Sequence, residues 1–204
     1  MSVSNTKEDD IQGQILQAAK QLFQTHGFRK VTIDDVARSI GKARSSLYYY
    51  YKTKEEILDA VITVEIRELL AAITSAVNQV KSTEQKITAF FTTKLQVIRE
   101  RRAFFNTPDT GMDAEEMTSY NKARYAVHKK IMEQESVLLQ QIITDGIRKG
   151  ELIKMNKEDQ QALIFVLLAS VRGLKQEMVL ENDFSMAAPA IRMLTRSLIH
   201  GLKK

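Results

Sequence analysis

Residues 42–54 combine cations, hydroxyl groups and aromatic rings in an arrangement suited to binding nucleic acid. Four of the six tyrosines in the chain are consecutive at Tyr48–Tyr51, and Arg44, Ser45 and Ser46 lie just before them. A guanidinium can donate to O6 and N7 of guanine together, whereas serine and tyrosine hydroxyls suit base edges and phosphates. This stretch is the first candidate for a functional surface.

The distribution of charge points to the same region. The chain has 204 residues and a formal net charge of +5. Residues 11–54 carry eight Lys or Arg against two Asp, residues 1–10 carry one Lys against three acids, and the remaining residues are nearly neutral. A basic module followed by a neutral body indicates a nucleic-acid reader joined to a second domain. Charge alone is equally consistent with a chance cluster on a solvated face.

Composition excludes several other classes of protein. The absence of cysteine excludes a disulfide framework, a Cys-ligated metal and a thiol nucleophile. Two prolines and eight glycines are too few for a many-stranded sandwich or barrel. The longest apolar run, residues 162–169, is far short of a membrane span, and residues 1–10 are too acidic for a signal peptide. We therefore expect a soluble, cytoplasmic, all-α protein with no metal and no cofactor.

Motifs of catalysis are missing from the sequence. Gly41-Lys42 does not form a phosphate-binding loop, because Val36 and Ala43 stand where the motif needs glycine and Ser or Thr. No Gly-x-Ser-x-Gly, His-Glu-x-x-His or dinucleotide-binding glycine pattern occurs. We expect no catalytic residues and no enzymatic activity.

Helical periodicity places the basic residues on short elements near the N-terminus. Apolar spacing predicts a helix over residues 9–26 that Gly27 ends, and a second helix that Thr32 caps and Gly41 ends. A short helix over residues 43–50 follows, and Thr53 with Glu56 forms a capping box for the next helix. Two short helices that are joined by a glycine-containing turn and packed on a first helix are typical of a helix-turn-helix.

The rest of the chain reads as a helical body. Further helices are expected over residues 54–80, 84–102, 113–146 (with an interruption), 157–181 and 186–202, with a loop at 106–111. Pro189 fits only the first turn of the last helix. The expected organisation is a flexible polar tail (1–10), a helix-turn-helix domain (11–55) and a helical domain (56–204), with about nine helices.

Residues 15–60 resemble the TetR family of bacterial one-component transcription regulators. The resemblance rests on residues 15–23, Gly27-Phe28, residues 32–37 and residues 47–58. It implies a three-helix N-terminal helix-turn-helix domain and a helical C-terminal domain that binds an effector and forms a homodimer. The implied function is a regulator, and more specifically a repressor, that binds a pseudo-palindromic DNA operator and is released by a small molecule.

Two departures from the family pattern affect the recognition helix. Lys42 and Ala43 occupy positions where the family usually has an apolar residue and then Ser or Thr. The missing cap weakens the start of this helix by about 1 kcal/mol unless another group binds its amides. Tyr51 replaces a usual Phe, and its hydroxyl needs a partner if it is buried.

The resemblance also gives roles to individual residues. If residues 43–50 form the recognition helix, Arg44 is the best base reader, and Tyr48 and Tyr49 are contact positions. Lys54 and Thr32, at helix starts, would meet phosphates, and Leu47 and Tyr51 belong to the core. The candidate DNA-binding residues are Thr32, Lys42, Arg44, Ser45, Ser46, Tyr48, Tyr49 and Lys54.

The second domain is expected to surround an effector cavity and to form the dimer. Aromatic and methionine side chains favour an apolar or aromatic effector, although plain core packing is the alternative. The candidate pocket residues are Phe90, Phe91, Phe104, Phe105, Met117, Tyr120, Tyr125, His128 and Phe165. The resemblance implies that the last two helices pair with a twin subunit as a four-helix bundle, through Leu163, Leu167, Val171, Leu174, Ile191, Leu194 and Leu198.

Two other functions stay open at this point. The chain could be a DNA-binding dimer that needs no effector, in which case its second domain would serve only for dimerisation. It could also be a helical protein–protein adaptor without DNA binding, which the departures at Lys42 and Ala43 favour slightly.

Overall fold

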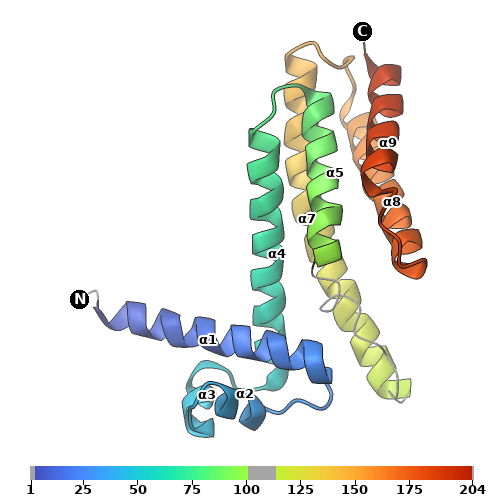
Figure 1. Ribbon diagram of the computed structural model, residues 1–204. Coiled ribbons are helices and arrows are strands. Elements are labelled where there is room, and N and C mark those ends of the chain that lie inside the picture. The colour runs from blue at the N-terminus through green and yellow to red at the C-terminus, as the bar shows by residue number, and fades with distance from the viewer. Residues whose placement is uncertain (1–2, 101–113, 204) are drawn as a thin grey trace. The chain divides into compact units, whose positions relative to one another are not determined.

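The computed structural model describes residues 3–100 and 114–203, and the side chains within residues 10–100 and 128–203. All regular structure in these ranges is α-helical, which confirms the all-α prediction (Figure 1). The helices are α1 (Val3–His26), α2 (Ile33–Ser39), α3 (Arg44–Tyr50), α4 (Lys54–Asn78), α5 (Thr83–Glu100), α7 (Ala114–Arg148), α8 (Lys157–Leu180) and α9 (Ala187–Leu202). None of these helices combines the length and apolar character that crossing a membrane requires.

The described residues form two compact units. The first contains residues 3–67 and 114–117, and the second contains residues 68–100 and 118–203. The division falls within α4, beyond the expected domain boundary at residue 55. The first half of α4 belongs to the first unit because Ile57 and Val61 are buried in its core.

Helix α1 begins earlier than the sequence analysis expects. It starts at Val3, so residues 3–10, expected as a flexible tail, continue the helix. These residues contain neither proline nor glycine, and nothing in them ends a helix that has already formed.

The first unit packs α1, α2, α3 and the start of α4 around one apolar core. Ile15, Ala19 and Phe23 line the buried face of α1, and Leu47 of α3 is completely buried. Figure 1 shows α2 and α3 as a short pair beside α1. This arrangement is the three-helix layout that the periodicity predicts.

The second unit is built on a larger core contributed by α4, α5, α7, α8 and α9. Phe90 and Phe91 are fully buried and lie edge to face, with their ring centroids 4.8 Å apart. Helix α7 runs from Ala114 to Arg148 without the interruption that the sequence analysis expects. Pro189 lies in the first turn of α9, as predicted.

A buried ion pair crosses the core of the second unit. Lys94 of α5 donates to Glu135 Oε2 of α7 at 2.7 Å, and the exposed fractions of the two residues are 9% and 0%. Glu135 Oε1 has no hydrogen-bond partner among the described residues. Burying two charges is costly, and removing only one of them leaves the other uncompensated.

We predict that Lys94→Met lowers the free energy of unfolding by about 3–5 kcal/mol, because the Glu135 carboxylate then stays buried without its cation. Urea denaturation followed by circular dichroism measures the change. The double variant Lys94→Met/Glu135→Leu should recover most of the loss. Equal losses in the single and double variants would show that the unpaired charge is not the cause.

Candidate nucleic-acid interface

The turn between α2 and α3 is fixed by backbone hydrogen bonds. Gly41 has a positive φ of 66°, the Gly41 N–H donates to Arg38 O, and the Lys42 N–H donates to Ala37 O. This is a Schellman motif, in which glycine at the left-handed position ends a helix without strain. The glycine therefore sets the direction in which α3 leaves the turn.

Helix α3 starts without a side-chain cap. Ala43 is its N-cap residue and makes no side-chain hydrogen bond to the first turn. The expected absence of a cap at this position is therefore confirmed. Because α3 has seven residues, its stability depends on tertiary packing rather than on its own hydrogen bonds.

Two buried residues anchor α3 and turn its other face outward. Leu47 is fully buried, and Tyr51 is 6% exposed with its hydroxyl accepting a hydrogen bond from Gln12 Nε2 at 2.9 Å. Both core assignments are confirmed, and the Tyr51 hydroxyl has the partner it needs. Tyr49 is 70% exposed, and Ser45 and other polar neighbours are exposed with it. The exposed positions are Lys42, Arg44, Ser45, Ser46 and Tyr49.

Arg44 is held by two neighbours. Its Nη1 lies 3.0 Å from Asp34 Oδ2 of α2, while Nη2 and Nε lie 2.7 Å and 3.3 Å from the Tyr48 hydroxyl. The guanidinium carbon also lies 5.2 Å from the centroid of the Tyr48 ring. The hydrogen bond to Tyr48 and the charge of Asp34 raise the pKa of Arg44 above its usual value. Arg44 therefore remains charged and has a defined orientation.

Thr32 caps α2 together with Asp35. The Thr32 hydroxyl accepts from the Asp35 N–H at 3.2 Å, and the Asp35 carboxylate accepts from both the Thr32 N–H and the Thr32 hydroxyl. Hydrogen bonds from Thr32 and the nearby guanidinium of Arg38 lower the pKa of Asp35. The Thr32 hydroxyl and amide thus already have a carboxylate partner where the sequence analysis expects a phosphate.

Lys54 points to the backbone that precedes α2. Its ammonium donates to Phe28 O at 2.9 Å and to Arg29 O at 3.3 Å, and it lies 4.3 Å from the centroid of the Phe28 ring. Burial lowers the pKa of Lys54, and the charge of Glu55 opposes that shift. In this arrangement Lys54 ties α4 to the turn between α1 and α2.

The start of α4 differs slightly from the expected capping box. The Thr53 hydroxyl accepts from the Glu56 N–H at 3.1 Å, as expected. The Glu56 carboxylate accepts from the Lys52 N–H at 2.6 Å, one residue before the predicted partner. Backbone N–H groups at the start of α4 therefore still have side-chain acceptors from both Thr53 and Glu56.

Sequence reasoning missed the role of Asp34. Asp34 and Asp35 both lie in the first turn of α2, but only Asp35 is used for capping. The partner of Asp34 is ten residues away across a turn, a separation that no helical periodicity reveals. The one sequence feature that pointed to this role is that Asp34 is an acidic residue, not needed for capping, within the strongly basic segment 11–54.

The four pocket candidates whose side chains the structure describes are not gathered around one cavity. Phe90 and Phe91 fill the core, whereas Phe165 is 66% exposed on α8. His128 is half-buried, with Nε2 3.2 Å from Arg172 Nη1. Phe104, Phe105, Met117, Tyr120 and Tyr125 lie outside the residues whose side chains the structure describes.

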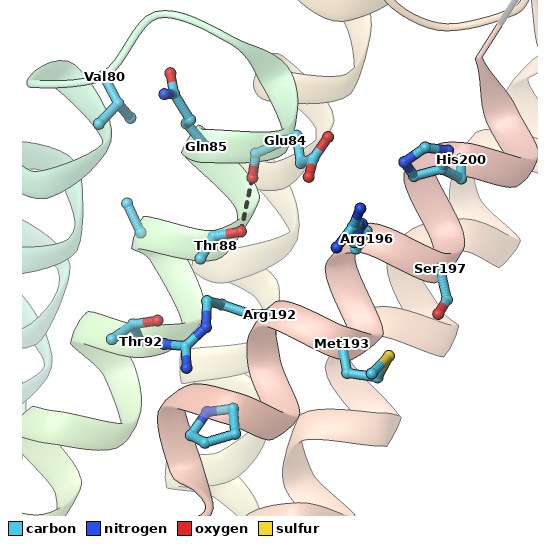
Figure 2. A pocket seen from close by; sticks show the side chains of 12 residues that line it. Val80, Glu84, Gln85, Thr88, Thr92, Arg192, Met193, Arg196, Ser197 and His200 are labelled. Carbon is cyan, nitrogen blue, oxygen red and sulfur yellow. Dashed lines mark hydrogen bonds between the residues drawn. The ribbon is translucent and has the colours of Figure 1, made fainter.

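A surface groove of about 1330 Å³ lies between α5 and α9 (Figure 2). Arg192, Arg196 and His200 of α9 face Thr88 and other residues of α5 across it. Neither Phe90, Phe91, His128 nor Phe165 lines the groove. Its lining residues are Val80, Glu84, Gln85, Thr88, Ala89, Thr92, Pro189, Arg192, Met193, Arg196, Ser197 and His200.

Three of the residues expected at a dimer interface are buried within the subunit instead. Leu167, Val171 and Ile191 are at most 1% exposed in the core of the second unit, because they face the helices of their own chain. Leu163, Leu174, Leu194 and Leu198 are half-buried against the same core. The large apolar side chains that α8 and α9 leave exposed are Phe165, Val166, Leu180 and Met193.

Comparison with known proteins agrees with the geometry of the first unit. The family described as bacterial regulatory proteins, tetR family, matches residues 15–61. The HTH-type transcriptional repressor KstR2 of Mycolicibacterium smegmatis is 28% identical over 90 residues, which are 44% of this chain and 44% of that protein. The HTH-type transcriptional regulator EthR of the same organism is 30% identical over 78 residues, which are 38% of this chain and 36% of that protein. The chain spans less than half the length of these two relatives.

Solved structures match the fold over nearly the whole chain. The fatty acid degradation regulator FadR from Bacillus halodurans superposes with a TM-score of 0.69 at 16% identity and covers 90% of this chain and 93% of that chain. A TetR/AcrR-family transcriptional regulator from Thermobifida fusca superposes with a TM-score of 0.62 at 21% identity and covers 96% of this chain and 100% of that chain. At these identities the likeness concerns the fold alone.

We predict that the second unit loses stability below about pH 6.5 because of His128. Burial and the charges of Arg172, Lys94 and Lys175 lower the pKa of His128, and its contact with Arg172 requires a neutral Nε2 that accepts. As the pH falls, the unfolded chain therefore binds a proton at this residue before the folded chain does.

Urea denaturation at about pH 7.5 and about pH 5.5 measures this effect. The difference between the two pH values should shrink in His128→Gln and stay unchanged in His26→Gln, which removes an exposed histidine of the first unit. A pH difference that is the same in His128→Gln and in the wild type would contradict the assignment.

Proposed function

Because the chain belongs to the TetR family of bacterial regulatory proteins, whose members regulate transcription, we propose that it is a DNA-binding repressor. It acts as a homodimer on a pseudo-palindromic operator and is released by a small-molecule effector. The observation that carries the proposal is the exposed face of α3, where Arg44 stands beside Ser45 and Tyr49 while Leu47 and Tyr51 anchor the opposite face.

Each part of this surface has a role that fits its chemistry. Arg44 reads a base edge in the major groove, and the small side chains of Ser45 and Ser46 allow α3 to approach closely. Tyr48, Tyr49 and Lys42 contact phosphates and sugars. Lys54 and Thr32 position the interface, since their polar atoms already bind the protein's own backbone and Asp35.

A homodimer supplies the second recognition helix that a palindrome requires. Two such helices about 34–36 Å apart would enter successive major grooves on one face of the DNA. The exposed apolar residues Phe165, Val166, Leu180 and Met193 of α8 and α9 are the surface we assign to the partner subunit. The half-buried residues Leu163, Leu174, Leu194 and Leu198 of the same two helices remain candidates for this contact.

Effector control follows from linkage between two conformations. An effector that prefers a dimer with the wrong helix separation weakens operator binding, and the operator weakens effector binding by the same factor. Residues 104–125 are rich in aromatic residues and methionine, which favours an apolar or aromatic ligand.

The proposal is tested by selecting binding sites from a random duplex library with the purified protein. We predict that it enriches a palindrome and that Arg44→Ala binds the enriched duplex about 5- to 150-fold more weakly in fluorescence anisotropy. Arg148→Ala is the matched control, because Arg148 is an exposed arginine of the second unit that also pairs with an aspartate. Selection without any enriched sequence would contradict the proposed function, and unchanged binding by Arg44→Ala would remove this residue from base reading.

We predict that the wild type sediments as a dimer and that Phe165→Glu sediments as a monomer, because a buried interface cannot accommodate an unpaired carboxylate. Phe165 is 66% exposed, so the substitution leaves the fold of the subunit intact. Val137→Glu places the same charge on α7 at a residue that is 71% exposed and should remain dimeric. A monomeric wild type, or a dimeric Phe165→Glu, would contradict the assigned surface.

A further inference from the structure

The surface of the first unit that we assign to DNA contains a carboxylate that capping does not explain. Asp35 is used by the capping box of α2 and by Arg38. Among the described residues, the contact of Asp34 is with Arg44, at 3.0 Å between Oδ2 and Nη1. A free carboxylate facing DNA is repelled by phosphates, so its position calls for another reason.

Stability does not supply that reason. The side chains of Asp34 and Arg44 are 43% and 59% exposed, and ion pairs between exposed side chains contribute little to folding. What the pair does is define the orientation of a long side chain that has many rotamers. Arg44 is fixed from both sides, by Asp34 of α2 and by Tyr48 one helical turn further along α3.

The hydrogen bonds of Arg44 leave two of its N–H groups without an acceptor among the described residues. A guanidinium has five N–H groups. The Tyr48 hydroxyl accepts from Nε and Nη2, and Asp34 accepts from Nη1, so three N–H groups are used. One N–H on Nη1 and one on Nη2 remain without an acceptor among the described residues. Two N–H groups are the number that a bidentate contact with guanine O6 and N7 requires.

Tyr48 keeps a donor as well. Its hydroxyl oxygen accepts from Arg44 and retains its own hydrogen, which can be donated to a phosphate. The same residue can therefore bind the DNA backbone and support the base reader.

We propose that Asp34 is a specificity-determining residue, which orients the Arg44 guanidinium toward one guanine without touching the DNA itself. The inference rests on the proposed DNA-binding function. Because Asp34 already orients Arg44 in the free protein, Arg44 loses less conformational entropy when it binds DNA. This advantage applies only to a contact that uses the orientation that suits guanine. Its main effect is on discrimination between sequences, because an unoriented Arg44 still attracts any duplex through its charge.

The test compares binding of the enriched palindrome with binding of duplexes that carry a single change. Each G·C pair of one half-site is replaced by A·T, and each guanine is separately replaced by 7-deazaguanine, which lacks the N7 acceptor. At one guanine, each of the two changes made separately should weaken binding by the wild type about 5- to 150-fold. Asp34→Asn should still bind DNA and keep the melting temperature of the wild type. Its affinities for the unchanged duplex and for the duplex changed at that guanine should have a ratio near one.

Two further variants separate this role from its alternatives. Asp59→Asn removes an exposed acid of α4 in the same unit and should keep the discrimination of the wild type, which controls for net charge. In the Arg44→Ala background, adding Asp34→Asn should change nothing at that guanine, because Asp34 acts through Arg44.

Three outcomes would overturn the inference while leaving the proposed function intact. The first is that Asp34→Asn retains the discrimination of the wild type, and the second is that it binds every duplex more tightly with discrimination intact. Either result would mean that Asp34 does not orient Arg44. An effect of Asp34→Asn that persists in the Arg44→Ala background would mean that Asp34 reads a base directly. A wild type that enriches no sequence would refute the proposed function, and the inference would fall with it.

Discussion

The burial of Leu47 and Tyr51 is the constraint on which the rest of the first unit depends. A helix of seven residues without an N-terminal cap is not stable in water, so α3 exists because its inner face is packed against the core. The same anchoring fixes which residues face outward. The Schellman turn at Gly41 then sets the direction of α3, and Lys54 ties the start of α4 to the turn before α2.

This anchoring explains why polar residues near the interface divide into two groups. Thr32, Asp35 and Lys54 form the frame of the interface, because they are hydrogen-bonded within the protein itself. Ser45 and Tyr49 project from that frame into solvent. A binding surface whose base reader is oriented before contact loses less conformational entropy on association than a mobile one. The ion pair between Asp34 and Arg44 joins the two groups.

The sequence predicted most of what depends on local chemistry. Helix ends at Gly27 and Gly41, the cap at Thr32 and the buried faces of α1 and α3 all follow from spacing and residue type. Interactions that cross between elements could not be predicted in this way. The orientation of Lys54 toward Phe28 is of this kind, because periodicity gives the face of a helix but not the destination of a long side chain.

Helix α8 shows the same limit on a larger scale, because it carries apolar residues both on the side that faces the core and on the side that faces away from it. Leu167 and Val171 of α8 face the core, whereas Phe165 and Val166 face away from it. When a helix is apolar on two sides, periodicity does not tell which side is buried in its own subunit and which side contacts a partner subunit. The sequence analysis assigned the inner residues to the partner. An exposed apolar face of this kind costs free energy in water unless a second surface covers it. If a partner subunit covers this face, as we propose, the stability of the second unit is linked to its assembly.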